Sequence, residues 1–318
     1  MERNLALELV RVTEAAALAS ARWMGKGDGD AADRAARDAV SVVMRSVKLS
    51  GHVIIGDTDV TVAAPSSKSA NKASEIPDVD IAVDALQSIQ ALAYGRPHAI
   101  ATIAVSNRGA FLVPPVPYMN KIAVGPEAAG RINLRASALD NLVNIADAKR
   151  CYVEDLTVCI LDRDRHRSLI DDVRAAGARI ALISDGDLTA MLATAVPTSG
   201  VDVVMGIGGS AEGVLAAAAL KCVGGDLQAQ FQARDDEEEH SLRAAGYDKR
   251  DSVLRVDDIV RGESTMFAAT GITNSDVMQG VQFVPGGAVT HSIVMRSQSG
   301  TVRQITAHHR FDRKPVYT

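Results

Sequence analysis

Apolar residues recur at helical and strand-like intervals through the first half of the chain. Those from Leu5 to Ala16 recur every three or four positions and predict a helix over 4–24. Asp30 is expected to cap a second helix that ends near Val47. Further apolar runs predict strands at 52–56 and 79–84, a helix at 85–94, and a hairpin at 100–113 that turns at Asn107–Gly109.

From about residue 150 short apolar runs alternate with amphipathic segments. This pattern favours a mostly parallel sheet covered by helices on both faces. The predicted strands are 156–161, 179–184 and 201–206, and the predicted helices are 165–178, 187–196 and 210–221. An acidic run at 235–239 is expected to open a further helix, and 291–297 with 301–307 to form a terminal hairpin.

The change of pattern predicts a layered α/β protein with two lobes. Residues 1–150 would form an α+β lobe, and residues 151–318 an α/β lobe. Net charge is −5 and aromatic residues make up 3%, which disfavours nucleic acid and anionic membranes as partners. Neither a membrane span of about 20 apolar residues nor a signal peptide is evident, and the three cysteines lack CxxC spacing. A cytoplasmic protein is therefore expected.

The stretch DVDIAVDALQSI, residues 78–89, is the first candidate for chemistry. Asp78, Asp80 and Asp84 share the parity of one strand face, so their charges must be compensated by water, by Lys or Arg, or by a metal ion. Other acids lie at strand ends or before helices, and oxygen ligands of this kind suit Mg²⁺ or Mn²⁺. The candidates are Asp28, Asp33, Asp57, Asp59, Asp80, Asp84 and Glu212, although Asp is also favoured in caps and turns, which are the more common explanation.

Three strand exits in the second half carry polar residues. Arg163 and Arg165 follow one strand, Asp185 and Asp187 the next, and Gly208 with Gly209 a third, before a helix. Guanidinium groups and free helix N–H groups bind phosphate, and carboxylates bind sugar hydroxyls. Ligands of open α/β sheets lie at such strand ends, although solvated turns would have the same composition.

Nine stretches together resemble the class II, bacterial type of fructose-1,6-bisphosphatase over nearly the whole chain. They are GKGD (25–28), VDIAVD (79–84), YMNKIAVGPEAAG (118–130), LDRDRH (161–166), LISDGD (182–187), VDVVMGIGGSAEG (201–213), AAALKCVGGD (217–226), FAATGIT (267–273) and VMRSQSGTVRQI (294–305). The resemblance implies the layered α/β fold of the inositol-monophosphatase-like sugar phosphatases. It also implies hydrolysis of the 1-phosphate of fructose-1,6-bisphosphate with Mg²⁺ or Mn²⁺ in gluconeogenesis, and a dimer or tetramer.

Roles carry over to matching positions. The resemblance implies metal ligands at Asp28, Asp84 and Glu212, with Asp57 where the family has Glu. It implies sugar-phosphate binding by Tyr118, Arg163, Arg165, Asp185 and Asp187, with the glycine turn of Gly208 and Gly209 beside them.

The departures from the family lie in its two acidic motifs. Where the family reads G-E-G-E-x-D-E-A-P, this chain has GDTDVTVAAP, so Thr61 replaces an Asp. Where the family reads D-P-x-E-G-T, residues 84–89 read DALQSI: Gln87 replaces a metal-binding Glu, and Ile89 replaces the Thr that assists the attacking water. Segment 66–77 has no evident counterpart. Weakened metal binding and weak or shifted phosphatase activity are expected, since one lost catalytic group typically costs about 10²–10⁴-fold.

Three hypotheses follow for function. The chain is a phosphatase with residual or shifted activity on a sugar phosphate. Alternatively, it is an inactive member that binds a phosphosugar or regulates an active paralogue. In the third case it has been recruited to different chemistry on a phosphorylated sugar in specialised metabolism.

Overall fold

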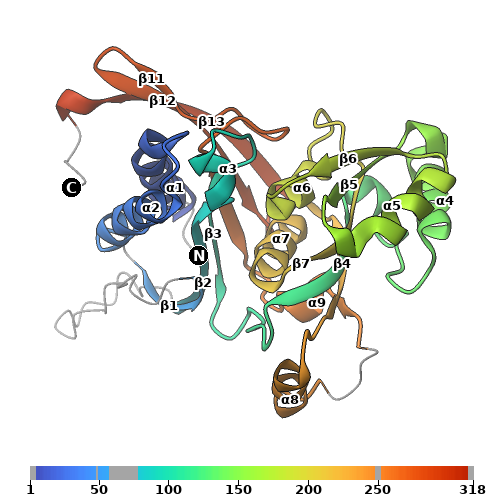
Figure 1. The fold of residues 1–318 in the computed structure, drawn as a ribbon. Coiled ribbons are helices and arrows are strands. Elements are labelled where there is room, and N and C mark those ends of the chain that lie inside the picture. Colours follow the sequence, from blue (N-terminus) through green and yellow to red (C-terminus); the bar gives the residue numbers. More distant parts are fainter. Residues whose placement is uncertain (1–4, 48, 57–77, 248–251, 314–318) are drawn as a thin grey trace. The chain divides into compact units, whose positions relative to one another are not determined.

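The protein consists of two compact units in the computed structural model, which describes residues 5–47, 49–56, 78–247 and 252–313. The first unit combines residues 1–111 with 262–318, and the second is residues 112–261 (Figure 1). The boundary predicted at residue 150 lies inside the second unit. The reason is strand β4 (Tyr118–Val124), which pairs with two strands of the second sheet although it precedes residue 150.

The first unit contains a mixed sheet. Within the described residues its strand order is β1-β2-β3-β10-β12-β11, and β13 also pairs with β12. The centre of the sheet is therefore built from both ends of the chain, because β10 lies between β3 and β12. The strands are β1 (Ser50–Ile55), β2 (Asp78–Gln87), β3 (Ile100–Asn107), β10 (Met266–Gly271), β11 (Gln282–Val284), β12 (Gly287–Arg296) and β13 (Thr301–Arg310).

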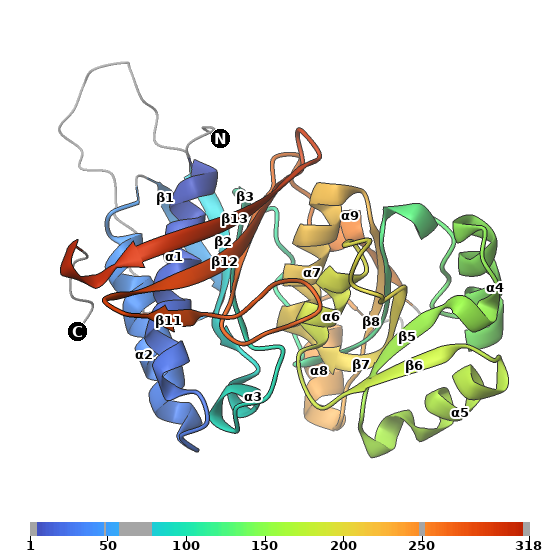
Figure 2. The same cartoon turned by 90° about the horizontal axis from the view of Figure 1, so that it is seen from above.

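Two helices, α1 (Leu5–Ser20) and α2 (Gly29–Met44), supply the core of this unit. They pack side by side against the sheet (Figure 2). Small residues at 15–17 of α1 are buried, so the helix backbone can lie close to the strands. Shorter elements are α3 (Ile89–Ala93) and the 3₁₀ turns Ala21–Trp23 and Phe311–Arg313.

The second unit is a three-layered α/β body. Its described strands follow the order β6-β5-β7-β4-β8-β9: the first three are parallel, and the others antiparallel to their neighbours. Helices α4 and α5 lie on one side of the sheet, and α6 and α7 on the other (Figures 1 and 2).

Most strands and helices of the second unit alternate along the chain. The strands are β5 (Thr157–Leu161), β6 (Arg179–Ile183), β7 (Val203–Gly209), β8 (Asp226–Phe231) and β9 (Leu254–Arg255). The helices are α4 (Ala138–Lys149), α5 (Arg167–Ala175), α6 (Asp187–Ala193), α7 (Ser210–Val223), α8 (Asp236–Ala244) and α9 (Val256–Ile259), with 3₁₀ turns at Pro126–Ala128, Val153–Asp155 and Asp164–His166.

Most of the elements predicted from the hydrophobic pattern are confirmed, including the series from β5 to α7 and the β12–β13 hairpin. Three details were wrong. Asp28, not Asp30, caps α2, because its carboxylate accepts the Ala31 N–H at 2.9 Å. Strand β2 continues to Gln87 and leaves only a short α3. Residues 110–113 form no strand, since β3 pairs with β2 and β10 instead.

Candidate functional site

A glycine turn between β7 and α7 brings two acidic side chains close to the backbone. A Cβ atom at Gly208 would overlap Asp187 Oδ2, and one at Gly209 would overlap Glu212 Oε2. Only glycine at both positions lets the carboxylates approach in this way. The structure thus brings together Asp187, the two glycines and Glu212, all of which the sequence singled out.

A buried lysine connects these groups. Lys121 lies in β4 with its side chain 2% exposed, and Nζ donates to Asp187 Oδ2 and to the Gly209 carbonyl, both at 2.7 Å. A buried ammonium group is tolerated only when it is paired in this way. Lys121 was not predicted from the sequence, although a lone lysine in the apolar run YMNKIAV is a usable signal.

Two of the carboxylates near this turn have raised pKa values. Burial, followed by repulsion from Asp187, raises the pKa of Glu212. Burial is also the main cause of the raised pKa of Asp185, and Asp187 adds to it. Because Lys121 hydrogen-bonds Asp187, the other two carboxylates would be stabilised by a further cation or by ligand hydroxyl groups.

Two arginines follow β5 and are anchored by backbone carbonyls. Arg163 donates to the carbonyls of Asp162, at 2.9 Å, and Ser184, at 2.7 Å. Arg165 donates through Nη2 to the carbonyl of Ile207 at 2.8 Å. Neither guanidinium pairs with a carboxylate among the described residues, so both can attract an anion.

A third arginine, Arg234, lies near the same aromatic ring as Arg165, that of Tyr118. The guanidinium carbon of Arg165 lies 5.6 Å from the ring centroid, and that of Arg234 lies 5.3 Å from it. Arg234 follows β8, which pairs with β4, and Gln232 N–H donates to the Tyr118 carbonyl at 2.9 Å. Arg234 was not predicted, because its closeness to Tyr118 depends on pairing between strands far apart in sequence.

His166 holds the arginine turn in place. Its ring is buried, Nδ1 lies 2.7 Å from the Leu161 carbonyl, and Nε2 accepts the Ile207 N–H at 2.8 Å. A proton on Nδ1 satisfies both contacts, so the ring is neutral. Burial, with the nearby charges of Arg165 and Arg163, lowers the pKa of His166.

In the first unit the loop that contains Asp28 is fixed to α3. Gly25 N–H donates to the Leu92 carbonyl at 3.0 Å, and Gly27 N–H to the Ala93 carbonyl at 2.9 Å. This places the start of α2 beside the end of β2. A Cβ at Gly29 would lie 2.6 Å from Ile89 Cγ2, so Ile89 packs directly against the residue after Asp28.

The end of β2 contains the altered motif. Asp84 is partly buried opposite Thr102 of β3, whose buried hydroxyl has no hydrogen-bond partner among the described residues. Gln87 is 4% exposed, and its Oε1 accepts the Ser88 hydroxyl at 3.0 Å. Ser88 has φ +68°, in the left-handed region, where the family motif has glycine.

Asp80 of the same strand has a structural role. Its buried carboxylate accepts the Gly109 N–H at 2.7 Å and a bond from Arg108 at 3.1 Å, which secures the turn after β3. The negative charge of Asp80 is therefore compensated by a backbone N–H group and an arginine. Asp57, Thr61 and segment 66–77 lie outside the described residues.

The family model for "Bacterial fructose-1,6-bisphosphatase, glpX-encoded" matches residues 3–309. The chain belongs to this family. Similar curated proteins carry the name D-fructose 1,6-bisphosphatase class 2/sedoheptulose 1,7-bisphosphatase. That of Thermosynechococcus vestitus is 37% identical, over 99% of this chain and 98% of its own length. That of Microcystis aeruginosa is 36% identical, over 100% and 99%, and that of a Synechococcus strain is 36% identical, over 98% and 97%.

Membership makes the chain a class II fructose-bisphosphatase-like protein of a metal-dependent phosphatase family. The acidic positions are chemically suited to such a metal, since the carboxylate oxygens of Asp28, Asp84 and Glu212 are ligands that hard divalent cations prefer. Asp28 and Asp84 belong to the first unit and Glu212 to the second. In the part of the chain that the structure describes, no three such side chains form a metal-binding group, and no helix is long and apolar enough to cross a membrane.

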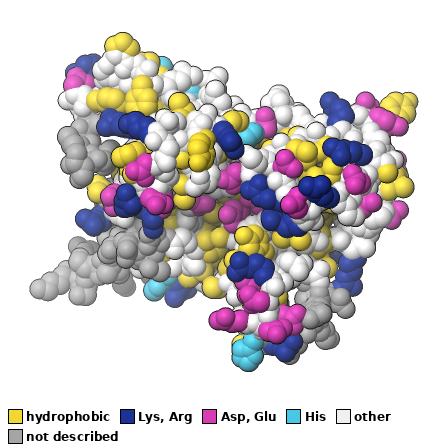
Figure 3. Space-filling model, viewed as in Figure 1, with side chains coloured by type: hydrophobic (Ala, Val, Ile, Leu, Met, Phe, Trp, Pro, Cys, Tyr) yellow, Lys and Arg dark blue, Asp and Glu magenta, His cyan; other side chains and the backbone are white. Residues whose placement is uncertain are grey.

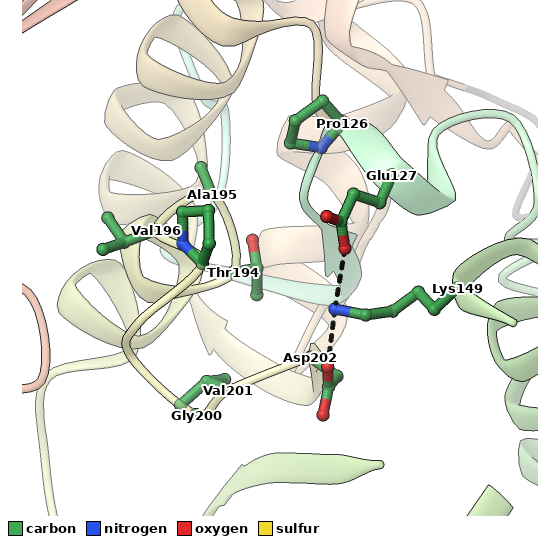
Figure 4. A pocket seen from close by; sticks show the side chains of 10 residues that line it. Pro126, Glu127, Lys149, Thr194, Ala195, Val196, Gly200, Val201 and Asp202 are labelled. Atoms are coloured by element: carbon green, nitrogen blue, oxygen red, sulfur yellow. Dashed lines mark ion pairs between the residues drawn. The ribbon is translucent and has the colours of Figure 1, made fainter. Parts of the chain in front are cut away.

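A small pocket of about 70 Å³ lies at the opposite end of the second sheet, where β7 begins. Lys149 lies there between Asp202, at 2.6 Å, and Glu127, at 3.2 Å (Figure 4). These two carboxylates raise the pKa of Lys149 although burial opposes the shift. The charges of Lys149, Asp202 and Glu127 compensate one another. We therefore interpret these three side chains as a structural ion-pair cluster at this end of the sheet.

Proposed function

We propose that the chain is a metal-dependent phosphatase that hydrolyses a phosphorylated ketose such as fructose-1,6-bisphosphate, at a rate lowered by its altered motif. The main support is the family match along residues 3–309, together with side chains of the second unit that match, or conservatively replace, those expected to hold the sugar phosphate. The named relatives make sedoheptulose-1,7-bisphosphate a second substrate to test.

Each part of the second unit has a distinct proposed role. Arg163, Arg165 and Tyr118 bind a phosphate group, for which the free guanidinium N–H groups and the phenol are suitable donors. Asp185 and Asp187 accept hydrogen bonds from sugar hydroxyls. Asp187 retains Oδ1 for this purpose, because Lys121 occupies Oδ2. Gly208 and Gly209 let the carboxylates of Asp187 and Glu212 lie close to the backbone, and the N–H groups at the start of α7, which follows them, suit an anion.

The proposed metal ligands are Asp28, Asp57, Asp84 and Glu212, and the metal is Mg²⁺ or Mn²⁺. A cation bound there would lower the pKa of the attacking water and stabilise charge on the phosphoryl oxygens. Gln87 supplies an uncharged amide in place of a carboxylate, and its oxygen already accepts the Ser88 hydroxyl. Ile89 offers no hydroxyl to orient water. Both changes are expected to lower the rate of the chemical step more than the affinity for the sugar phosphate.

A phosphate-release assay with Mg²⁺ and with Mn²⁺ tests the proposal. The substrates are fructose-1,6-bisphosphate, sedoheptulose-1,7-bisphosphate and their monophosphates, with chelator as control. We expect slow, chelator-sensitive release from a bisphosphate. No release, with ligand binding intact, would favour an inactive or regulatory member instead. A product other than free phosphate, detected by mass spectrometry, would indicate the recruited enzyme.

We further propose that the protein acts in the cytoplasm as a homo-oligomer, a dimer or tetramer, and that a paralogue is an alternative partner. Support comes only from the family. Sedimentation of the purified chain, alone and with an active paralogue, measures both.

A further inference from the structure

We propose that Arg234 belongs to the sugar-phosphate site, where it binds the retained phosphate together with Arg165 and Tyr118, and that Glu238 limits the affinity of this site. The inference rests on the proposed function and adds two residues that the family resemblance did not assign. It concerns the phosphate that remains on the sugar after the 1-phosphate has been removed.

Arg234 and Arg165 share one aromatic platform. Both guanidinium carbons lie within 5.6 Å of the Tyr118 ring centroid, close enough for cation–π contact. They come from separate elements, since Arg165 lies in the turn after β5 and Arg234 follows β8. Both groups are cations beside the same ring, so a phosphate dianion bound there would be attracted by each of them.

The two guanidinium groups also retain unused donors. Arg165 uses Nη2 for the Ile207 carbonyl. Arg234 uses Nε, at 2.7 Å, and Nη2, both for Glu238 Oε1. Among the described contacts Nη1 of each arginine has no acceptor, and an arginine fork of this kind matches phosphate oxygens. Because Arg234 is exposed, a ligand can reach it.

Glu238 both holds Arg234 and opposes an anion. Its Oε2 accepts the backbone N–H of Arg234 at 2.8 Å, so the carboxylate is fixed beside the guanidinium. It lies in the acidic first turn of α8, whose side chains form a patch below basic ones (Figure 3). A glutamine at position 238 would keep an oxygen acceptor for Arg234 while it removes the negative charge.

Calorimetric binding of fructose-1,6-bisphosphate, fructose 6-phosphate and fructose 1-phosphate tests the inference in four variants. Arg234→Gln should weaken binding of the first two sugars about tenfold, the usual effect of one charge-assisted hydrogen bond, and leave fructose 1-phosphate unchanged. Glu238→Gln should tighten the first two about threefold. The matched controls, Arg243→Gln and Glu239→Gln, alter an i,i+4 pair that lies wholly within α8 and should leave binding of all three sugars unchanged.

Binding distinguishes this inference from the proposed function, because it needs no catalysis. If wild type binds the bisphosphate and Arg234→Gln binds it equally well, Arg234 is not part of the site. If Glu238→Gln weakens binding, the carboxylate positions Arg234 and does not limit affinity. If wild type binds none of the three sugars, both the inference and the proposed substrate are wrong.

Discussion

Gln87 and Ile89 are single side chains that determine how much catalysis the first unit can support. Gln87 is buried with its amide oxygen engaged by Ser88, and Ile89 packs against the helix start that Asp28 caps. Neither contact needs a ligand, so the altered motif is a well-packed structure in its own right. The effect of the substitutions on phosphatase activity can therefore be measured separately from their effect on folding.

The double variant Gln87→Glu with Ile89→Thr should raise the metal-dependent rate of phosphate release at least tenfold, because each restored group can contribute about 10²-fold or more. Steady-state kinetics with Mg²⁺ and Mn²⁺ measures the change. Gln90→Glu, at an exposed neighbouring position, adds the same charge outside the motif and should have no effect. An unchanged rate in the double variant would mean that these two positions do not limit catalysis.

Gly29 and Ile89 should be energetically coupled. Gly29→Ala in wild type places a methyl group against Ile89 Cγ2 and should destabilise the fold by about 1–3 kcal/mol. In an Ile89→Ala background that contact is absent, and the same change should be nearly neutral. Urea unfolding of the four proteins gives the coupling energy. Ile89→Thr retains Cγ2 and should preserve the penalty; additive effects would contradict the contact.

His166 should make stability depend on pH. Its pKa is lowered in the folded protein, so above about pH 6.5 the ring is neutral in both states and makes no difference. Below that pH the His166 ring is protonated in the unfolded chain while it is still neutral in the folded protein. The free energy of unfolding therefore falls as the pH decreases, until the pH reaches the lowered folded-state pKa. An NMR titration of the His166 ring should give a pKa below 6.5. A higher value would contradict a neutral ring with a hydrogen bond at each nitrogen.

At the scale of single elements, two helix ends place different residues in the same backbone conformation. Arg150 ends α4 with φ +55°, and Gly224 ends α7 with φ +76°. Left-handed backbone costs a non-glycine residue roughly 1–2 kcal/mol. The two ends therefore allow matched substitutions in opposite directions.

Arg150→Gly should stabilise the protein by about 1 kcal/mol, and Gly224→Ala should destabilise it by a similar amount. Arg150→Ala is the control, because it removes the exposed side chain and keeps the left-handed penalty. The midpoint of urea unfolding reports each change. Equal stabilisation by Arg150→Gly and Arg150→Ala would show that the side chain, and not the backbone, is responsible.

Elements with local signals could be predicted from sequence, and those that depend on distant pairing could not. The expectation that ligands bind at the carboxyl ends of parallel strands singled out Asp187, Gly208 and Gly209. These residues do lie together, because parallel strands end at one edge of the sheet. Arg234 escaped notice because only antiparallel pairing of β8 with β4 brings it to Tyr118. Gln87 was placed in a helix because its neighbours Ala85 and Leu86 favour one, yet pairing with β3 keeps it in a strand.

At the scale of the whole molecule the second unit is an insertion into the first. Leu112 N–H donates to the Ile259 carbonyl at 2.9 Å, so the chain enters and leaves this unit at neighbouring points. The unit has its own apolar core, formed by α4, α5 and the strands beneath them. These properties are those of a domain that folds independently.

A fragment of residues 112–261 should fold alone and unfold cooperatively in urea, as followed by circular dichroism. A fragment of residues 151–261, which begins at the boundary expected from the sequence pattern, should not, because it lacks β4 between β7 and β8. Cooperative unfolding of the shorter fragment would show that β4 is dispensable and that the pattern change does mark a domain.

The position of β10 has a consequence for synthesis in the cell. This strand lies between β3 and β12, so the first unit lacks the middle of its sheet until residues after 262 have left the ribosome. Domains usually fold in the order in which they are translated. Here the order must be reversed: the inserted unit can fold during translation, while the apolar face of α1 waits for partners from the other end of the chain. The face of α1 that packs on β10 and β12 is therefore expected to stay exposed until both strands have been synthesised.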